Sequence, residues 1–420
     1  MLSLQANQCN LLNDAKRGVN RMTKTTETIS EQVKKEKESI QTVPRKTLSS
    51  DNGKIYYGHS DEVNRLGYND YNDFIKNRNG KQSMNGFDAE YLDIVDYVIK
   101  ITHQIWEERG IGVIYKTYHN NVTMHCGSLN LQGINSVISN TLQTLHAFPD
   151  RRLIGGNVVW SGNDKEGFYS SHRINSTATN LGDSTFGTAT GKRVSFRTTV
   201  DCAVHSNRIY EEWLVRDNLY IVQQLGLDPH EIAKSLAQST KSNASSLQLN
   251  CGISETMNGQ LMPTVFEPKS TQFDIGEFIL DLYNKIWEWR LFNQLNEYYA
   301  DYAVVHYICD KDLVGYDQIQ GMLVSLLASF PNAKFLVDRV TCNPLDDKDD
   351  WDVSVRWRLQ GLHEGIGYFG QPSWKPVEIL GINQLRVIDG KVVEEWMTFD
   401  GLDVLKQIYL NAVDPIETTS

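Results

Sequence analysis

An internal repeat limits what this chain can fold into more than any other feature of its sequence. Four motifs occur twice, in the same order and separated by 181 to 183 residues. The pairs are Ile105-Trp106-Glu107 and Ile286-Trp287-Glu288, Tyr118 with His125 and Tyr299 with His306, Phe148-Pro149 and Phe330-Pro331, and Glu211-Glu212-Trp213 with Asp217 and Glu394-Glu395-Trp396 with Asp400. Constant order and spacing indicate duplication. We therefore predict two copies of one unit, over residues 86–228 and 271–413.

Each copy begins with helical periodicity and ends with strand periodicity. Apolar residues recur every three or four positions between Leu92 and Ile105, which predicts an amphipathic helix. In the second copy, apolar and polar residues alternate from Trp351 to Leu359, and Asp389-Gly390 separates two further strands as a hairpin turn. Helices followed by antiparallel strands indicate an α+β fold, with helices against one face of a curved sheet.

The segments outside the two copies are polar. Residues 1–85 are predicted to be an arm, largely extended or disordered, and 229–270 a linker with a short helix around Glu231–Ala237. The chain has 41 Lys and Arg against 52 Asp and Glu, a net charge of -11, which argues against binding nucleic acid through bulk charge. No apolar run reaches the roughly 18 residues needed to cross a membrane. Six scattered cysteines without a zinc spacing favour reduced thiols, a cytoplasmic location and no metal site.

The repeated motifs resemble the SnoaL-like polyketide cyclase (ester cyclase) family of the nuclear transport factor 2-like superfamily. The residues that carry this resemblance are the strand-end His125 and His306, the Gly133 to Phe148-Pro149-Asp150 segment, and the Glu-Trp motifs that lead to Asp217 and Asp400. The resemblance implies two tandem cone-shaped α+β barrels, each with an apolar pocket between sheet and helices. It also implies a small organic substrate, no cofactor, and a general acid/base at the position of Asp217 and Asp400. Relatives dimerise, so the fused copies are expected to form a pseudo-dimer within one chain, with a homo-oligomer as a further option.

Strand alternation gives these two aspartates a chemical rationale. In a regular strand, Trp213 and Asp217 share one face, as do Trp396 and Asp400. Burial on an apolar, aromatic face raises the pKa of a carboxyl group, which suits proton transfer near neutral pH. The alternative is a strand-end Asp that caps a turn or pairs with an Arg such as Arg216. A β-bulge would exchange the faces of Glu211 and Glu394 with those of their neighbours Glu212 and Glu395.

Further candidate site residues surround these positions. His125 and His306 end apolar segments, where a neutral imidazole orients substrate, or where a His simply bonds to backbone. Arg356 is a candidate carboxylate ligand or a surface residue. The candidate substrate-binding residues are Trp213, Trp396, His363, Arg356, Trp357, Tyr118 and Tyr299.

Three functional hypotheses follow. The first is a cofactor-independent enzyme that moves protons on a small carbonyl compound, in an aldol-type cyclisation, an isomerisation, or a related lyase or hydrolysis step. Asp217, Asp400 or both would be the acid/base, assisted by His125 and His306. The second is a binding or scaffold protein in which one or both pockets are inactive. The third combines one catalytic copy with one structural copy.

Overall fold

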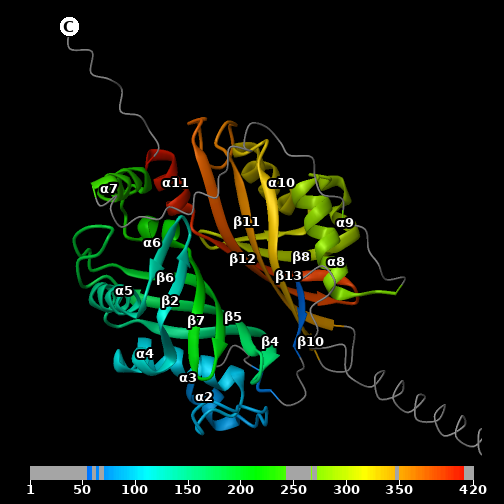
Figure 1. The fold of residues 1–420 in the computed structure, drawn as a ribbon. Coiled ribbons are helices and arrows are strands. Elements are labelled where there is room, and N and C mark those ends of the chain that lie inside the picture. Colours follow the sequence, from blue (N-terminus) through cyan, green and yellow to red (C-terminus); the bar gives the residue numbers. More distant parts are fainter. Residues whose placement is uncertain are drawn as a thin grey trace, which may run out of the picture. The chain divides into compact units, whose positions relative to one another are not determined.

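The computed structural model describes residues 54–58, 63–65, 71–242, 266, 272–345 and 350–410. The described residues form two similar units, which we call domain 1 and domain 2 (Figure 1). Much of the predicted arm and linker lies outside the described residues. Of the described part of the arm, Tyr71–Asn77 forms helix α2, and Ile55–Tyr57 forms strand β1, which pairs parallel with a strand of domain 2.

Domain 1 begins with helices and ends with long antiparallel strands. Its elements are α3 (Ile94–Trp106), α4 (Gly112–Thr117), β2 (Tyr118–Cys126), β3 (Leu129–Gln132), α5 (Ile134–Ala147), β4 (Arg152–Asn163), β5 (Gly167–Thr179), β6 (Arg193–His205), β7 (Arg208–Arg216) and α6 (Asn218–Gln224). Helix α3 begins where the Asp93 carboxylate accepts a hydrogen bond from Asp96 N at 2.7 Å. The sheet order is β3-β2-β7-β6-β5-β4, with β2 and β7 parallel and the other pairs antiparallel.

Domain 2 repeats this arrangement. Its elements are α8 (Ile275–Leu282), the π-helix η3 (Tyr283–Glu288), the 3-10 helix η4 (Phe292–Gln294), α9 (Leu295–Tyr298), β8 (Tyr299–Tyr307), β9 (Lys311–Val314), α10 (Gly315–Ser329), β10 (Lys334–Leu345), β11 (Asp350–Leu362), β12 (Pro376–Ile388), β13 (Lys391–Phe399) and α11 (Gly401–Leu410). The sheet order is β1-β10-β11-β12-β13-β8-β9, the same as in domain 1 apart from the added edge strand. Asp389 and Gly390 both have positive φ, as the predicted hairpin turn requires. The two mixed sheets with their helices confirm the predicted α+β fold.

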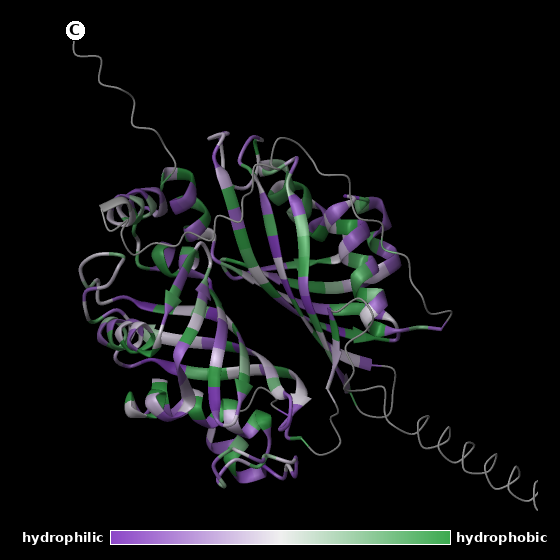
Figure 2. Ribbon diagram, in the orientation of Figure 1, coloured by the Kyte–Doolittle hydropathy of each residue, from purple (hydrophilic) through white to green (hydrophobic). Residues whose placement is uncertain are grey.

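The two sheets face each other, with α3, α4 and α5 on the outer side of one and α8, α9 and α10 on the outer side of the other (Figure 1). Polar contacts cross between the sheets: Ser354 Oγ donates to Ser171 Oγ at 2.7 Å, and Arg173 Nε donates to Gln384 Oε1 at 3.1 Å. Figure 2 shows hydrophilic and hydrophobic residues alternating along the long strands. Each sheet therefore has an inner face toward its own helices and a more polar face toward the other sheet.

Helix α7 (Pro229–Ser242) covers part of the predicted linker and packs against α11. No helix in the described part of the chain is long and apolar enough to span a membrane.

Candidate active site

A β-bulge decides which residues of the last strand face the interior of domain 1. Ile209 pairs with Val204 and Glu211 pairs with Ala203, so Tyr210 is an extra residue in β7. The bulge places Glu212 on the interior side together with Ile209. Strand β13 has the same irregularity at Val393. The bulged alternative for Glu211 and Glu212 therefore holds. Trp213 does not line the cavity that Glu212 faces, and its substrate-binding role stays a prediction.

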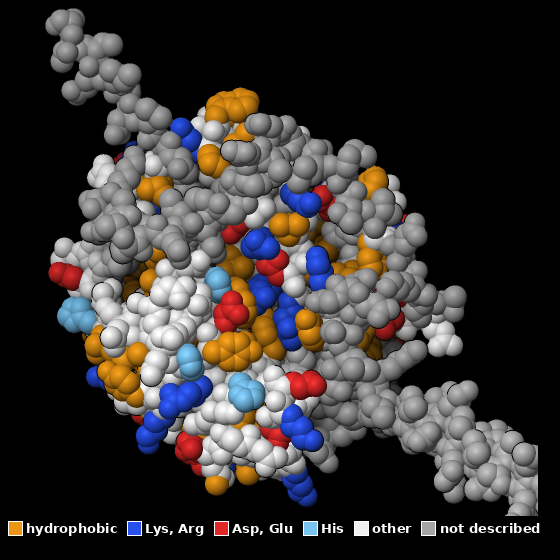
Figure 3. All heavy atoms as spheres, in the orientation of Figure 1, with side chains coloured by type: hydrophobic (Ala, Val, Ile, Leu, Met, Phe, Trp, Pro, Cys, Tyr) orange, Lys and Arg blue, Asp and Glu red, His pale blue; other side chains and the backbone are white. Residues whose placement is uncertain are grey.

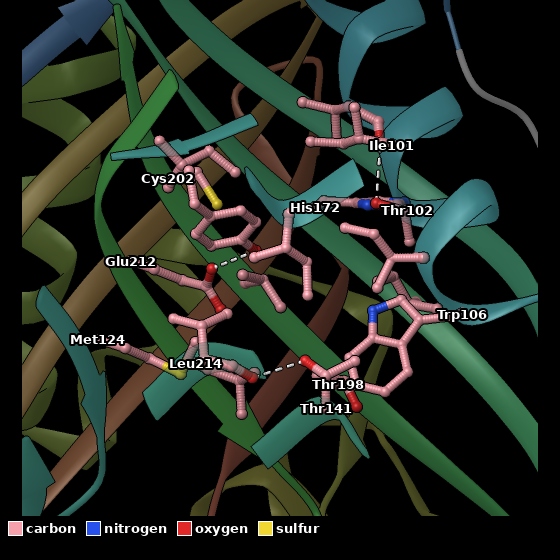
Figure 4. Close-up of a pocket in the computed structure, with 18 of the residues that line it drawn as sticks. Ile101, Thr102, Trp106, Met124, Thr141, His172, Thr198, Cys202, Glu212 and Leu214 are labelled. Atoms are coloured by element: carbon pink, nitrogen blue, oxygen red, sulfur yellow. Dashed lines mark hydrogen bonds between the residues drawn. The ribbon is translucent and has the colours of Figure 1, made fainter. Parts of the chain in front are cut away.

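Domain 1 contains a largely enclosed cavity between its sheet and its helices, with a volume of about 60 Å³. The side chains that line it come from α3, α5 and the strands β2, β5, β6 and β7. Figure 4 shows Glu212 of β7 and Trp106 of α3 reaching toward the same space. A void of this size holds several waters, which a small ligand would displace. The cavity is therefore a place where a small ligand contacts ionisable groups.

Glu212 is the acidic residue of this cavity. It is buried, and Tyr118 Oη donates a hydrogen bond to its Oε2 at 2.8 Å. Burial raises its pKa from the ordinary value to about 7, against the smaller lowering effects of Tyr118 and of the positive charge of Arg216. A carboxyl group with this pKa is present in both protonation states at neutral pH, as general acid/base catalysis requires. Of the predicted site residues, Tyr118 lines this cavity.

Five polar atoms around the same cavity are buried and have no hydrogen-bond partner among the described residues. They are Arg151 Nη1, Ser170 Oγ, His172 Nε2, Thr198 Oγ1 and Arg216 Nε. Burial lowers the pKa of His172 to about 3, so its imidazole is neutral at physiological pH. Buried polar groups in proteins are normally paired, so a cluster of unpaired ones around a void indicates a place for a polar ligand.

The corresponding interior of domain 2 is filled by aromatic side chains. Trp357 is fully buried, and its ring centroid lies 5.6 Å from that of Trp287 and 5.2 Å from that of Phe335. Glu395, the counterpart of Glu212, accepts hydrogen bonds from three groups: Tyr299 Oη at 2.6 Å, Asn383 Nδ2 at 2.5 Å and Tyr283 Oη at 3.3 Å. The predicted substrate-binding residues Trp357 and Tyr299 are thus core residues of domain 2.

Asp217 and Asp400 lie at helix starts and not on the lining of the domain 1 cavity. Asp217 accepts hydrogen bonds from Tyr220 N at 3.2 Å and from Cys309 N of domain 2 at 2.5 Å. Asp400 accepts from the first turn of α11 and, at 2.5 Å, from Asn218 Nδ2 of domain 1. Burial raises the pKa of both, that of Asp400 to about 7. Their contacts are those of helix caps that also join the domains, which was the alternative considered for them. An acid/base role for either residue stays a prediction.

His125, Trp213 and Arg356 form a stack between the sheets. The rings of His125 and Trp213 are stacked with centroids 5.2 Å apart, and the Arg356 guanidinium carbon lies 3.5 Å from the Trp213 centroid. His125 Nε2 lies 2.9 Å from Glu211 Oε1. We call this set ladder 1.

Ladder 2 repeats ladder 1 with the domains exchanged: His306 stacks on Trp396, and the Arg173 guanidinium carbon lies 3.6 Å from the Trp396 centroid. His306 Nε2 lies 3.0 Å from Glu394 Oε1. The structure therefore brings the predicted histidines and tryptophans together with the predicted Arg356, at the contact between the domains and not in the domain 1 cavity.

A second cavity, of about 490 Å³, adjoins ladder 1 and is lined by Trp213, Glu211, Arg339 and Arg356 among others. On the face in Figure 3, basic, acidic and hydrophobic side chains are interspersed near the centre of the view. The arginines of this cavity are partly engaged: the guanidinium carbon of Arg339 lies 3.6 Å from the centroid of the Tyr169 ring, and Arg356 Nη1 donates to Tyr169 Oη at 3.0 Å, while Arg356 Nε has no partner among the described residues. This cavity therefore offers fewer unused donors than the cavity of domain 1.

His363 lies outside both interiors, in the loop after β11. It is buried, and its Nδ1 lies 3.0 Å from Ser373 Oγ. Burial lowers its pKa. In the described part of the chain, no group of three or more His, Cys, Asp or Glu residues is arranged to hold a metal ion.

Sequence reasoning missed the polar residues of the domain 1 interior. A signal for them exists in the repeat itself: at an offset of 183, Ser170 and His172 stand where the second copy has Val353 and Val355. Polar residues at positions that are apolar in the other copy mark a face that is buried yet polar.

Comparison with known proteins agrees with this fold. Residues 277–408 match the model of the family described as SnoaL-like polyketide cyclase. Residues 277–408 are a SnoaL-like polyketide cyclase domain. Domain 1 has the same sheet order and helix arrangement as this domain, which makes the chain a tandem of two such folds. A search of the curated proteins finds no match.

Solved structures similar to parts of the chain include a SnoaL-like protein from Jannaschia sp. CCS1, with 19% identity, 34% of this chain and 100% of that chain covered, and a TM-score of 0.29. IdmH from Streptomyces antibioticus has 25% identity, with 32% and 96% covered and a TM-score of 0.26. A protein from Catenulispora acidiphila with a ketosteroid isomerase-like fold has 18% identity, with 31% and 92% covered and a TM-score of 0.25.

Proposed function

We propose that domain 1 is a cofactor-independent enzyme in which Glu212 transfers a proton to and from a small carbonyl compound, and that domain 2 is its structural partner. The observation that carries this proposal is the position of Glu212: a buried carboxyl with a pKa of about 7 faces a cavity ringed by unpaired polar atoms. The family match suggests the reaction class: domain 2 matches the SnoaL-like polyketide cyclase model, and domain 1, which has the same sheet order, would carry the chemistry of that family.

The chemistry requires no group beyond the side chains of the cavity. The ionised carboxylate of Glu212 removes a proton from the carbon next to the substrate carbonyl, and the C–H bonding pair becomes the enolate. His172 lines the cavity with its Nε2 unpaired among the described residues, and as a neutral donor it would bind the developing oxyanion. Protonated Glu212 then returns its proton, either to another carbon in an isomerisation or to the alkoxide formed when the enolate attacks a second carbonyl.

Tyr118 positions the acid/base group. Its hydroxyl donates to Glu212 Oε2, and it is the one hydrogen-bond donor to Glu212 among the described residues. The other carboxylate oxygen is therefore available to a substrate proton. Glu395 differs in this respect, since three donors hold it in the filled interior of domain 2. This difference supports one catalytic copy and one structural copy.

Proton exchange tests the proposal without knowledge of the product. A panel of small ketones and oxo acids would be incubated with the protein in deuterated water, and loss of the α-proton signal would be followed by NMR. We expect Glu212→Gln to lower the enzymatic exchange rate about 100-fold or more, as loss of a general base does. Tyr118→Phe, which keeps the ring but loses the donor, should lower the rate less.

The matched comparison is with the two helix-cap aspartates. Asp217→Asn and Asp400→Asn keep a side chain that can cap a helix, and we expect them to retain exchange activity wherever circular dichroism shows them folded. The opposite pattern, exchange lost in folded Asp217→Asn or Asp400→Asn and kept in Glu212→Gln, would refute the role of Glu212.

A non-catalytic binding protein is the second candidate. The interior of domain 2 favours it, because the counterpart of Glu212 is enclosed there by three hydrogen-bond donors. The cavity of about 340 Å³ in that domain is lined by other residues, among them Glu288 and Phe335. Ligand binding to domain 1 without exchange of any substrate proton would support this candidate.

A further inference from the structure

Two arginines lie beside the domain 1 cavity without a carboxylate hydrogen-bonded to them. Arg151 is 4% exposed; its Nε and Nη2 donate to Ser176 Oγ at 3.2 and 3.0 Å, and its Nη1 has no partner among the described residues. The guanidinium carbons of Arg151 and Arg216 lie 5.3 and 5.8 Å from the centroid of the same Phe196 ring. Both positive groups therefore border one small region of the interior.

The carboxylates near this region are hydrogen-bonded to groups other than the two arginines. Asp400 acts on Arg216 from a distance, and it accepts hydrogen bonds from Asn218 Nδ2 and from the first turn of α11. Glu212 is the one acidic residue that lines the cavity, and it is hydrogen-bonded to Tyr118. Glu107, an acid that acts on Arg151 from a distance, accepts Leu153 N at 2.6 Å and lies 3.4 Å from the exposed Arg152. Buried charges in proteins are normally paired, since an isolated one is costly. A second anion at this place would balance the site.

Domain 2 shows that the fold itself needs no such charges. At the positions that correspond to Arg151 and Arg216, domain 2 has Ala333 and Phe399, and both are buried in its hydrophobic core. Packing alone does not explain two cations in the interior of domain 1, because the same backbone packs well with apolar residues there.

The remaining unpaired atoms suit an oxyanion. The hydroxyls of Ser170 and Thr198 are nearly inaccessible, and each is free to donate into the cavity. Guanidinium and hydroxyl donors are the groups that bind carboxylates in proteins, and a cavity of about 60 Å³ admits only a compact one.

We propose that the domain 1 cavity binds the carboxylate of a small organic acid through Arg151 and Arg216. The substrate class is then a small oxo acid, which carries both this carboxylate and a carbonyl group. The oxo group of this substrate is inferred from the proposed function of Glu212. The carboxylate site is inferred from the arginines and hydroxyls alone and does not depend on that function. The arginines anchor one end of the molecule, and the carbon beside its carbonyl is presented to Glu212.

Calorimetric titration of the full chain tests the site. The probes are pyruvate and acetoacetate, and their methyl esters serve as neutral controls of nearly the same shape; ionic strength is held constant with chloride. We expect each acid to bind at least tenfold more tightly than its ester. Arg151→Gln and Arg216→Gln should each weaken binding of the acids tenfold or more. The matched control is Arg152→Gln, next in sequence but with 75% of its side chain exposed, which should leave binding unchanged.

Two hydroxyl variants test the same site if an arginine variant does not fold. Thr198→Val and Ser170→Ala remove hydroxyls that have no protein partner, so they should not lower stability, and we expect each to weaken acid binding threefold or more. Equal binding of acids and esters would overturn the proposal. So would inorganic phosphate that competes with pyruvate at equal concentration, because the site would then be one for inorganic anions.

Glu212→Gln separates this inference from the proposed function. Acid binding kept in this variant, with proton exchange lost, supports both. Acid binding kept with exchange also kept refutes the role of Glu212 and leaves the carboxylate site in place. Loss of acid binding in the folded Gln variant would refute the carboxylate site as described, because removal of a negative charge should not weaken binding of an anion.

Discussion

Domains 1 and 2 share one backbone plan but differ in what fills it. Where domain 1 has Ile174 and Thr198, domain 2 has Trp357 and Gly381, at the same offset of 183. The exchange is coupled, because a side chain at Gly381 would place its Cβ 2.1 Å from Cζ2 of Trp357. A large indole thus fits only against a residue without a side chain. At this place domain 2 therefore has an aromatic core, although its strands follow the same order as those of domain 1.

The difference between the two interiors indicates which domain to test for function. In the interior of domain 2, three donors hold Glu395, although the buried Trp287 Nε1 has no partner among the described residues. The interior of domain 1 leaves several polar atoms without partners and a void beside them. Unpaired buried polar groups lower the stability of a protein unless a ligand or water binds them.

The largest expected difference between the two domains is in the stability lost when a matched interior residue is truncated. Trp357→Ala removes a fully buried ring, and we expect a loss of about 3–5 kcal/mol in the free energy of unfolding. Ile174→Ala, at the matching position of domain 1, should cost about 2 kcal/mol, since the side chain already borders a void. Urea denaturation followed by circular dichroism measures both. Equal losses would show that the two interiors are packed alike.

The ionisation of Glu212 provides a second, pH-dependent contrast. Burial raises the pKa of Glu212 from its ordinary value of 4.5 to about 7, so the folded protein holds the proton more tightly than the unfolded chain. Stability is therefore lost as pH rises from about 4.5 to about 7 and is level above that, by roughly 3 kcal/mol in total. Glu212→Gln, which cannot ionise, should gain on wild type by this amount at pH 8 and by little at pH 4.5.

Thermal or urea unfolding of both proteins between pH 4 and 8 measures this gain. The groups that face Glu212 are Tyr118, Arg216 and Cys202, and the substitution leaves all of them in place. A stability difference that does not change with pH would contradict the raised pKa, and with it the main support for acid/base chemistry in domain 1.

The repeat made most of the fold predictable, whereas the site was not. Local sequence patterns predict the duplication, the order of the helices and the Asp389-Gly390 turn, and the structure confirms the resulting fold class. The direction of side chains in the last strand depends on a single extra residue, Tyr210, whose bulge has no signature that alternation reveals. This one residue exchanges Glu211 and Glu212 between the two faces of the sheet.

The roles of the aromatic residues escaped prediction for a second reason. Trp213 and Trp396 suggested a pocket because strand alternation places each on the same face as an aspartate, but a sheet with two covered faces encloses side chains on both. Whether the second face meets solvent or another sheet is a question of how the two copies pack, and the sequence of one copy carries no periodic signal for that.

The two domains are alike in ladders 1 and 2. Substitutions there are expected to change the free energy of unfolding least. Arg356 lies on Trp213 and Arg173 lies on Trp396 at nearly the same distances, 3.5 and 3.6 Å. Lysine keeps the charge but loses the planar stacking group, so Arg356→Lys and Arg173→Lys should each lower the free energy of unfolding by about 1 kcal/mol. The exposed Arg193→Lys is the control and should change it by less than about 0.5 kcal/mol.

Similar losses in both ladder variants, measured by urea denaturation, would show that the contact between the domains has kept its twofold character while their interiors diverged. Proton exchange in domain 1 should meanwhile be unaffected by Arg173→Lys or Arg356→Lys, because neither side chain lines its cavity. A variant that lowers exchange without lowering stability would instead show that domain 2 acts on the chemistry of domain 1 through this contact, and the division into a catalytic and a purely structural copy would fail.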